Sequence, residues 1–408
     1  MARRQGPLRG RRGGGRLRPG VRPPTARGRP VTPIPPPPDR PLRVGIDASA
    51  AAVPRPTGVG LAIARQCAAL RDRSDIFVEV LYRLSRLRRR RHFLPGRSRF
   101  FADSWTPGLA RRLDVFHGPD ARLPSLRGPA LVATIHDLSA QHGYSTARFR
   151  RTREAHWRRV RERARLVVTY TQAVREELER VLGIPGERVA VVPLAAAADV
   201  SHELPAVARA RVAAWVGEGP YVLCLGELSR RKNTVGALEA FAAAGLVRHR
   251  LVLCGPEGYG AEAVEAAVGR LGLVGRVVRP SYLPSAAVAS LLRGADALLF
   301  PSRYEGFGMP LLEAFRAEVP VVASRAPALL EVSAGAALHA DAEDAVGLGA
   351  ALREAVDPGA RAERVARGRE RARAFTWERT AARLSEVYRA AAEGRPAPAT
   401  CSEAACQP

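Results

Sequence analysis

The sequence is poor in the features that mark secreted, metal-binding and membrane-spanning proteins. Its five cysteines form no Cys-x-x-Cys pair and lie beside no histidine at zinc spacing: Cys67, Cys224, Cys254, Cys401 and Cys406. No apolar run approaches the roughly eighteen residues of a membrane span, and the start lacks the apolar core of a secretory signal. These absences favour a protein of the reducing cytoplasm.

Acidic residues are also scarce. The 408 residues include 65 Lys and Arg but only 39 Asp and Glu, so the formal net charge is +26 and the pI is about 11.3. This balance suggests nucleic acid, an anionic membrane or a phosphorylated substrate as a partner. Residues 1–41 are rich in Arg, Gly and Pro, and we expect them to be disordered. They are either a tether to an anionic surface or a dispensable tail, for example one from a wrongly chosen start codon.

One stretch of the chain organises the rest. Ala297–Phe300 is an apolar run of the length of a buried strand, and Gly306-Phe-Gly308 then permits a tight turn. Pro310 suits the first turn of a helix, and the run 320–323 is typical of the next buried strand. A strand, glycine turn, helix and strand in this order predict a parallel α/β sheet.

The chemistry of this stretch lies at the turn. Free N–H groups of Gly308, Met309 and Leu311 at a helix N-terminus would suit a phosphate. Glu305 precedes the turn and Glu313 follows it on the helix, so both carboxylates can border one pocket and accept hydrogen bonds from hydroxyls. The alternative is that Glu313 only caps the helix and Glu305 is solvated.

The motif Pro301-Ser-x-x-Glu305-Gly-Phe-Gly-x-Pro310-x-x-Glu313-Ala resembles the signature of the retaining GT-B glycosyltransferases of family 4, also called glycosyl transferases group 1. The resemblance covers roughly residues 42–390 and is most specific in 221–325. It implies that Glu305 contacts the transferred sugar and that Glu313 holds the nucleotide ribose. It also implies donor contacts at the turn, from Gly306, Phe307, Gly308 and Met309.

A second loop fits the same family. After the strand at 221–226, the pattern Gly226-x-x-x-x-Arg231-Lys232-Asn233 resembles the family's diphosphate loop, which implies that Lys232 and Arg231 bind the phosphates. Without the resemblance this would be a solvated basic loop. The glycine turn at Gly255 is expected to line the nucleotide base. Many family members have Arg where this chain has Glu227, whereas a subset of the family lacks that Arg, so the resemblance leaves open whether one phosphate contact is missing here.

The first part of the chain contains the residues that we expect on the acceptor side of the site. Gly58 and Gly60 follow the strand at 42–47 and permit close backbone approach to a ligand. His117 and His136 each end an apolar strand, and such ends face the ligand in a doubly wound sheet. The segment Thr134-Ile-His136-Asp137-Leu138 resembles the family's first domain, which implies that His136 lies near the sugar and the scissile bond. His117 is expected nearer the acceptor, although a lone histidine is more often structural.

Two arginine-rich segments, 83–94 and 146–165, mix arginines with aromatic residues. They would suit an anionic membrane surface or an RNA backbone, or they are ordinary solvated helices. The predicted location is therefore cytoplasmic, with peripheral binding at the inner face of the cell membrane as an option. No Asp-x-Asp lies at a strand end, so we expect no metal and no cofactor.

These observations predict an α/β protein of GT-B architecture, with two Rossmann-like parallel-sheet domains facing across a cleft. The expected parts are a tail (1–41), an acceptor domain (42–213), a donor domain (214–376), a helix crossing back to the first domain (377–392) and a loose tail (393–408).

The resemblance implies a hexosyltransferase that moves a sugar, with mannose as the first guess, from a nucleotide-diphosphate sugar to a saccharide or lipid-linked acceptor with retention. GDP-mannose is the guessed donor, and no specific nucleic acid is expected as a partner. Departures from the family at Leu61-Ala62, Leu194-Ala195 and Glu227 keep alternatives open. These are a sugar-nucleotide-binding protein with weak or no transferase activity, and a GT-B epimerase or synthase.

Overall fold

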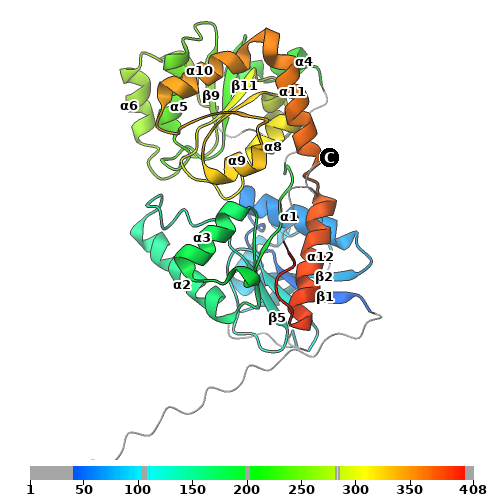
Figure 1. The fold of residues 1–408 in the computed structure, drawn as a ribbon. Coiled ribbons are helices and arrows are strands. Elements are labelled where there is room, and N and C mark those ends of the chain that lie inside the picture. Colours follow the sequence, from blue (N-terminus) through cyan, green and yellow to red (C-terminus); the bar gives the residue numbers. More distant parts are fainter. Residues whose placement is uncertain are drawn as a thin grey trace, which may run out of the picture. The chain divides into compact units, whose positions relative to one another are not determined.

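The computed structural model describes residues 40–96, 98–102, 108–109, 111–197, 203–280, 283 and 285–399. The predictions for residues 1–39 and 400–408 lie outside this part of the chain. The described residues form two parallel sheets (Figure 1). The first has the strand order β3-β2-β1-β4-β5-β6-β7 and the second β10-β9-β8-β11-β12-β13. In each sheet the strand order reverses between two neighbouring strands, β1 and β4 in the first and β8 and β11 in the second. Ligands of such sheets bind outside the carboxyl ends of the strands at this reversal.

The strands of the first sheet are β1 (Leu42–Asp47), β2 (Ile76–Arg83), β3 (Ser98–Phe101), β4 (Val115–Gly118), β5 (Ala130–Thr134), β6 (Leu166–Thr169) and β7 (Val189–Val191). Those of the second are β8 (Tyr221–Leu225), β9 (Arg250–Cys254), β10 (Val277–Val278), β11 (Ala297–Phe300), β12 (Val321–Ser324) and β13 (Leu338–Ala340). Most are short, apolar and buried on both faces, as parallel strands covered by helices must be.

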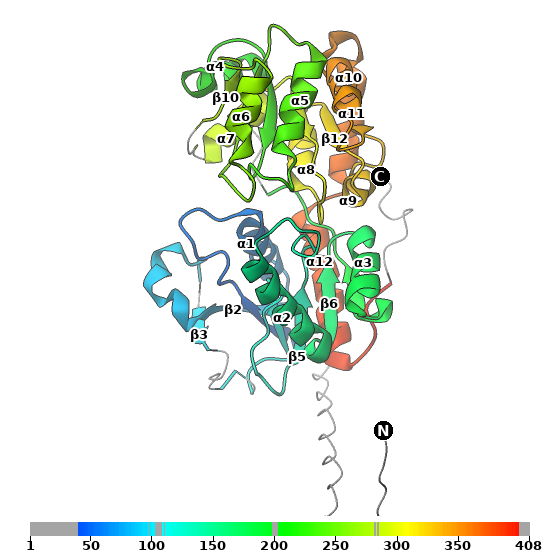
Figure 2. The ribbon, with the colours of Figure 1, turned by 90° about the vertical axis from the view of Figure 1, so that its left-hand side faces the viewer.

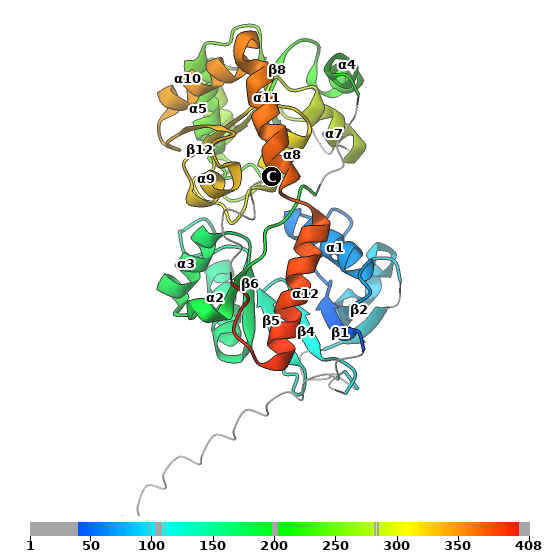
Figure 3. The same ribbon diagram turned by 45° about the vertical axis from the view of Figure 1, so that its right-hand side comes forward.

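Helices cover both faces of the first sheet (Figure 3). Helices α1 (Gly58–Arg71) and α12 (Trp377–Glu393) share one buried cluster with β1, whereas α2 (Ala147–Arg163) and α3 (Gln172–Leu182) share another with β6. The cause is the two-residue period of a strand, which sends alternate apolar side chains to opposite faces.

The second sheet is covered in the same way (Figure 2). One apolar cluster contains residues of α4 (Pro205–Val216), α7 (Ser285–Arg293), α8 (Met309–Arg316) and α9 (Pro327–Ser333). The other contains residues of α5 (Thr234–Ala244), α6 (Ala263–Arg270) and α10 (Ala345–Val356). Each sheet therefore forms its own three-layer α/β domain.

The chain returns to the first domain at its end. Helix α11 (Pro358–Arg373) packs so closely on α8 that a Cβ on Gly368 would lie 2.6 Å from the Phe315 ring. Helix α12 instead packs on the first sheet, where the Tyr388 hydroxyl lies 2.8 Å from His117 Nδ1. The predicted crossover helix is therefore present, and it joins the last element of the second domain to the core of the first.

Three local features differ from the sequence predictions. The predicted domain boundary at 213/214 falls inside α4, which packs against α7 of the second domain, so the chain changes domain before α4. Helix α1 starts at Gly58, so Gly58 and Gly60 lie in its first turn and not in a loop. The segment 83–94 contains the 3₁₀ helix η1 (Leu84–His92); a second one, η2, spans Gly186–Arg188. Among the described residues no helix has both the length and the apolar character to cross a membrane.

Candidate active site

A buried cluster of charges lies where β8 and β11 end. Lys232 Nζ donates to Glu305 Oε1 at 2.6 Å, and Arg231 Nη1 donates to Glu305 Oε2 at 3.3 Å. The side chains are 14%, 20% and 7% exposed for Lys232, Arg231 and Glu305. The structure thus brings together three residues that the two sequence motifs predicted separately.

The three side chains of this cluster alter one another's pKa values. Burial raises the pKa of Glu305, but the positive charges of Lys232 and Arg231 outweigh burial, so its pKa lies below the ordinary value. Burial lowers the pKa of Lys232, and the Glu305 carboxylate offsets only part of that effect. Arg231 is also buried, yet Glu305 and Asp137 raise its pKa. The site therefore contains two desolvated cations for one directly bonded carboxylate.

Lys232 is the only lysine among the 65 basic residues of the chain. Its ammonium lies 4.6 Å from the centre of the Phe300 ring, at the end of β11. Lysine supplies a compact charge on a flexible stem, and arginine a planar fork. A chain that uses arginine at every other basic position therefore has a chemically distinct cation at this one.

Helix α8 begins beside this cluster. Its N-cap is Gly308 at φ 101°, a conformation that suits glycine, and a Cβ there would also lie 2.5 Å from Leu329. Met309 and Pro310 form the first turn and are partly exposed, whereas Glu313 is buried. The predicted helix start is present, and partly exposed residues form its first turn. The Leu311 N–H, however, donates to the Gly308 carbonyl at 3.0 Å, so the prediction of a free N–H group is wrong for Leu311.

Phe307 has a different environment from the rest of the turn. Its ring lies between those of Tyr170 and Phe375, with centroids 6.2 and 5.8 Å away. Only 4% of the residue is exposed. The side chain therefore joins apolar residues of both domains, and only its backbone is left for the predicted donor contact.

Gly306 lies in direct contact with the first domain. A Cβ on it would lie 2.0 Å from the carbonyl oxygen of His136 and 3.1 Å from Asp137 Cβ. Thr171 Oγ1 donates to the Gly306 carbonyl at 3.1 Å and accepts from Val174 N at 3.3 Å, so it also caps α3. This close approach is possible because residue 306 has no side chain.

His136 is held in one protonation state. Its Nε2 lies 2.5 Å from the Pro119 carbonyl oxygen, which can only accept, so Nε2 carries the proton. Burial lowers the pKa of His136 despite the nearby Asp120 carboxylate, which raises it. The ring is neutral at pH 7, and its Nδ1 has a lone pair that can accept a hydrogen bond.

His117 does not share this site. Its Nδ1 bonds to Tyr388 Oη and its Nε2 to Thr134 Oγ1, both at 2.8 Å. The residue is 1% exposed, and burial lowers its pKa to about 3. Both nitrogens are occupied inside the core, so the contacts do not match the predicted position beside an acceptor. The histidine instead ties α12 to the first sheet.

The remaining predicted glycines lie at close backbone contacts. A Cβ on Gly58 would lie 2.9 Å from the Met309 side chain, which places the start of α1 next to the start of α8. A Cβ on Gly60 would lie 3.0 Å from the Ala50 carbonyl oxygen. A Cβ on Gly255 would lie 1.8 Å from the Gly226 carbonyl oxygen, so that glycine lets β8 and β9 end side by side.

Sequence reasoning missed the polar residues that join the two domains. Tyr304 Oη donates to Glu177 at 2.5 Å and accepts from Leu138 N at 2.9 Å. The Glu331 carboxylate accepts from the N–H groups of Gln172 and Ala173, at 2.7 and 3.0 Å, at the start of α3. The position of Tyr304 just before Glu305 was the one available signal; the other partners lie more than a hundred residues away.

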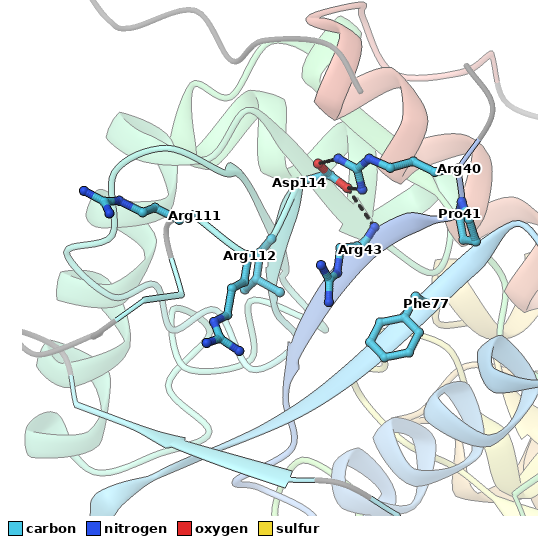
Figure 4. A pocket seen from close by; sticks show the side chains of 8 residues that line it. Arg40, Pro41, Arg43, Phe77, Arg111, Arg112 and Asp114 are labelled. Atoms are coloured by element: carbon cyan, nitrogen blue, oxygen red, sulfur yellow. Dashed lines mark hydrogen bonds and ion pairs between the residues drawn. The ribbon is translucent and has the colours of Figure 1, made fainter. Parts of the chain in front are cut away.

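A pocket of about 310 Å³ lies at the opposite edge of the first sheet, where β1 and β2 begin (Figure 4). Phe77 and the guanidinium of Arg43 border it, whereas Arg111 extends away from both. The one lining carboxylate, Asp114, is bound by Arg40 and by Arg43 N. None of the predicted site residues lines this pocket. Among the described residues, no group of three or more His, Cys, Asp and Glu side chains could hold a metal ion.

Comparisons with known proteins identify the family of the chain. The family Glycosyl transferases group 1 matches residues 209–373, and Glycosyltransferase Family 4 matches residues 58–197. O-antigen chain mannosyltransferase B of Escherichia coli is 30% identical over 288 residues, which span 67% of this chain and 74% of that protein. D-inositol 3-phosphate glycosyltransferase of Kineococcus radiotolerans is 31% identical over 262 residues, 58% of this chain and 59% of that protein.

Solved structures share the fold. Sucrose-phosphate synthase of Thermosynechococcus elongatus has a TM-score of 0.64 at 20% identity and covers 86% of this chain and 98% of its own. Anabaena HepE, solved with UDP and glucose, has a TM-score of 0.64 at 16% identity, and the match covers 84% of this chain and 98% of HepE.

Two parallel-sheet domains joined by a returning C-terminal helix define the GT-B class of proteins. Within that class, the chain belongs to the family 4 type of glycosyltransferases, and it is therefore a transferase enzyme.

Proposed function

We propose that this glycosyltransferase takes its sugar from a nucleotide-diphosphate donor bound at Arg231, Lys232 and the start of α8. It transfers that sugar to a saccharide or lipid-linked acceptor with retention of configuration. The observation that carries the proposal is the pair of buried cations, one of them the only lysine of the chain, beside a glycine turn and a helix N-terminus.

Charge explains how these residues would act. The bond between the anomeric carbon and the diphosphate oxygen breaks, and the negative charge that develops on the diphosphate is stabilised by Lys232, Arg231 and the N–H groups at the start of α8. A diphosphate that binds Lys232 also competes with Glu305 for its ammonium. Glu305 is then free to accept a hydrogen bond from a sugar hydroxyl.

The acceptor half of the reaction is proposed at His136. The acceptor oxygen bonds to the anomeric carbon, and its proton passes to the departing phosphate oxygen, so no covalent enzyme intermediate is needed. The neutral His136 ring cannot compete with the cations for the phosphates. Its Nδ1 lone pair is suited to accept a hydrogen bond from a sugar hydroxyl.

The experiment is a thermal-unfolding panel of nucleoside diphosphates and their sugars, followed by measurement of nucleotide release. The true donor should raise the Tm most, because binding to the folded state stabilises it by mass action. Lys232→Ala should lose this shift, and Arg248→Ala, at an exposed position of the same domain, should keep it. The proposal fails if Lys232→Ala retains the full shift and rate.

The sugar and base are the least constrained part of the proposal. The Escherichia coli relative is named a mannosyltransferase, which favours GDP-mannose, whereas the Anabaena neighbour was solved with UDP and glucose. GDP-mannose, GDP, UDP-glucose and UDP therefore head the panel. Turnover of donor without any acceptor would instead indicate an epimerase or hydrolase, and binding without turnover a sugar-nucleotide-binding protein.

A peripheral position on the cytoplasmic face of a membrane is also proposed. Supporting it, η1 exposes Leu84 and Leu87, each about 41%, among the arginines of residues 86–91. Flotation with anionic and neutral vesicles tests the idea. Binding should require anionic lipid and weaken when Leu84 and Leu87 become Ser; equal binding to both vesicles, or to neither, contradicts it.

A further inference from the structure

A group of arginines gathers where the strands of the first sheet end, at the edge that carries His136. Arg83 ends β2, Arg86 lies in η1, Arg122 follows β4, and Arg153 lies on α2. Carboxyl ends of parallel strands meet at one edge of a sheet. Because these residues come from four elements, the fold rather than a single basic stretch of sequence brings them together.

Two carboxylates partly neutralise this group. Asp47 accepts from Arg83 Nε at 2.9 Å, and Asp120 accepts from Arg153 Nη1 at 2.8 Å. Arg122 Nε also lies 3.4 Å from Asp120, an ion-pair contact that makes no hydrogen bond. Four guanidinium groups thus face two carboxylates, and the local charge stays positive.

Several nitrogen atoms of the group have unused bonding capacity. Arg86 Nε and His156 Nδ1 are buried and have no hydrogen-bond partner among the described residues. Burial lowers the pKa of Arg86, and the charges of Arg89 and Arg122 lower it further. His156 behaves alike, since burial, Arg122 and Arg153 all lower its pKa. Buried donors without partners are uncommon in folded proteins, and an anion would satisfy them.

The loop that carries Asp120 and Arg122 has an unusual backbone. Ala121, between them, has φ 54°, the left-handed region that alanine rarely adopts. Gly118 approaches the Arg122 carbonyl so closely that a Cβ there would overlap it. The fold therefore maintains a strained turn between Asp120 and Arg122, as is common at binding sites, and the charge of Arg122 is within electrostatic range of Arg86 and His156.

We propose that Arg86, Arg122 and His156, with Arg153 behind them, bind a phosphate group of the acceptor, so that the acceptor substrate is a phosphorylated saccharide or a phosphate-linked lipid. This inference rests on the proposed function, because it names the chemical class of that enzyme's acceptor. The planar forks of the arginines match phosphate oxygens, and the neutral imidazole adds one donor or acceptor.

The position of the group fits an acceptor site. His136 Nε2 bonds to the Pro119 carbonyl, one residue before Asp120, and the charges of Asp120 and Arg153 reach the His136 ring. Asp137, the next residue in the chain, is within electrostatic range of Arg231 of the donor site. The charges of the arginine group thus reach His136, and those of the donor cations reach its neighbour Asp137, so the proposal assigns the reacting hydroxyl to the region beside His136.

The test measures binding of hexose 6-phosphate and of unphosphorylated hexose by calorimetry. The donor-site cations are removed first, as Arg231→Ala with Lys232→Ala, so that phosphate binding there does not contribute. In this background the hexose phosphate should bind and the hexose should not. Adding Arg86→Gln or Arg122→Gln should weaken binding at least about 10-fold, the scale of one charged hydrogen bond. Arg158→Gln, exposed on α2, should leave it unchanged.

Further arms separate the possible results. Arg122→Lys keeps the charge and should restore part of the binding, which loss of structure alone would not allow; circular dichroism checks the fold of each variant. A short isoprenyl phosphate in detergent that binds more tightly than the hexose phosphate identifies a lipid-linked acceptor, and the reverse identifies a soluble one. The inference is overturned if no phosphate compound binds, or if Arg158→Gln weakens binding as much as Arg86→Gln.

The two proposals can fail separately. Donor binding is read from nucleotide-sugar stabilisation of the wild-type protein. Phosphate binding is read in a variant that lacks the donor cations. Phosphate binding without any donor stabilisation would refute the proposed donor chemistry and leave the anion site standing. Donor stabilisation without phosphate binding would refute only the acceptor class.

Discussion

Replacing Gly306 with alanine tests whether the contact between the two domains positions the site. The added Cβ would lie 2.0 Å from the His136 carbonyl oxygen and 3.0 Å from the carbon that carries it. Carbon and oxygen atoms do not approach closer than about 3 Å without a bond. The neighbouring atom belongs to backbone, which has no alternative rotamer, so the glycine turn and the His136 strand end must separate by about 1 Å.

That displacement reaches the groups proposed to be catalytic directly. Gly306 is bonded in the chain to Glu305, and His136 supplies the carbonyl that would be pushed away. A misplacement of about 1 Å at reacting groups costs roughly 10²-fold in rate. We therefore expect Gly306→Ala to lower kcat by about that factor. It should also destabilise the protein by about 1–3 kcal/mol, the usual range for overpacking.

The measurements are kcat and KM for sugar transfer, with the Tm of each variant. Gly269→Ala is the matched control, because an added Cβ on this α6 residue meets no atom within 4 Å. It should keep full activity and gain about 0.5–1 kcal/mol from helix propensity. If Gly306→Ala transfers sugar at the wild-type rate with an unchanged Tm, the close approach of the domains at His136 does not exist in the working enzyme.

Three further predictions test single groups. Lys232→Ala should lower kcat by about 10²-fold or more, the cost of losing one donor to a developing anion, and Lys232→Arg should fail to restore the wild-type rate. A wild-type rate in Lys232→Ala would refute the assignment. Thr171→Ala should cost about 1–3 kcal/mol in urea unfolding, since the α3 cap and the bond to the Gly306 carbonyl are both lost, while Thr171→Ser should lose less. His117, with its pKa lowered to about 3, stays neutral when folded but binds a proton when unfolded below about pH 6.5, so stability falls as pH falls through that window. The slope of the free energy of unfolding against pH should be about 1.4 kcal/mol per pH unit smaller in His117→Gln than in the wild type. Equal slopes in the two proteins would contradict the buried environment of His117.

Much of the fold was predictable because its strands are uninterrupted apolar runs. The run at 297–300 became β11, and the run at 320–323 became β12 with its bounds shifted by one residue. Short edge elements were missed. β3 contains arginine and two phenylalanines in four residues, and β13 is three residues long with two of them half-buried, so neither has enough alternation to be recognised.

The site was predictable where a motif is local and unpredictable where contacts are distant. Glu305 and the Arg231-Lys232 pair each lie in a short recognisable pattern, and the structure joins them. Apart from the family-like segment around His136, nothing local marks His117 as structural, since both histidines end apolar runs of the sequence. What makes His117 structural is a contact with Tyr388, which lies 271 residues further along the chain. The Tyr388 hydroxyl is hydrogen-bonded to His117 Nδ1. The Gly306 contact with His136 likewise arises only when both domains are folded.

The contacts between the domains also suggest how the donor enters. Lys232 and Glu305 are largely buried, so a diphosphate reaches them only if the groups around them move. Many of those groups are joined by polar bonds, such as Tyr304 with Glu177 and Glu331 with the start of α3. Such bonds contribute only about 0.5–1.5 kcal/mol each, because water replaces them when they break. By contrast α12 is anchored to the first sheet by apolar packing. We propose that opening breaks these polar contacts and the Phe307–Tyr170 contact while α12 remains docked, and that it exposes the same cations that closure would press against the departing diphosphate.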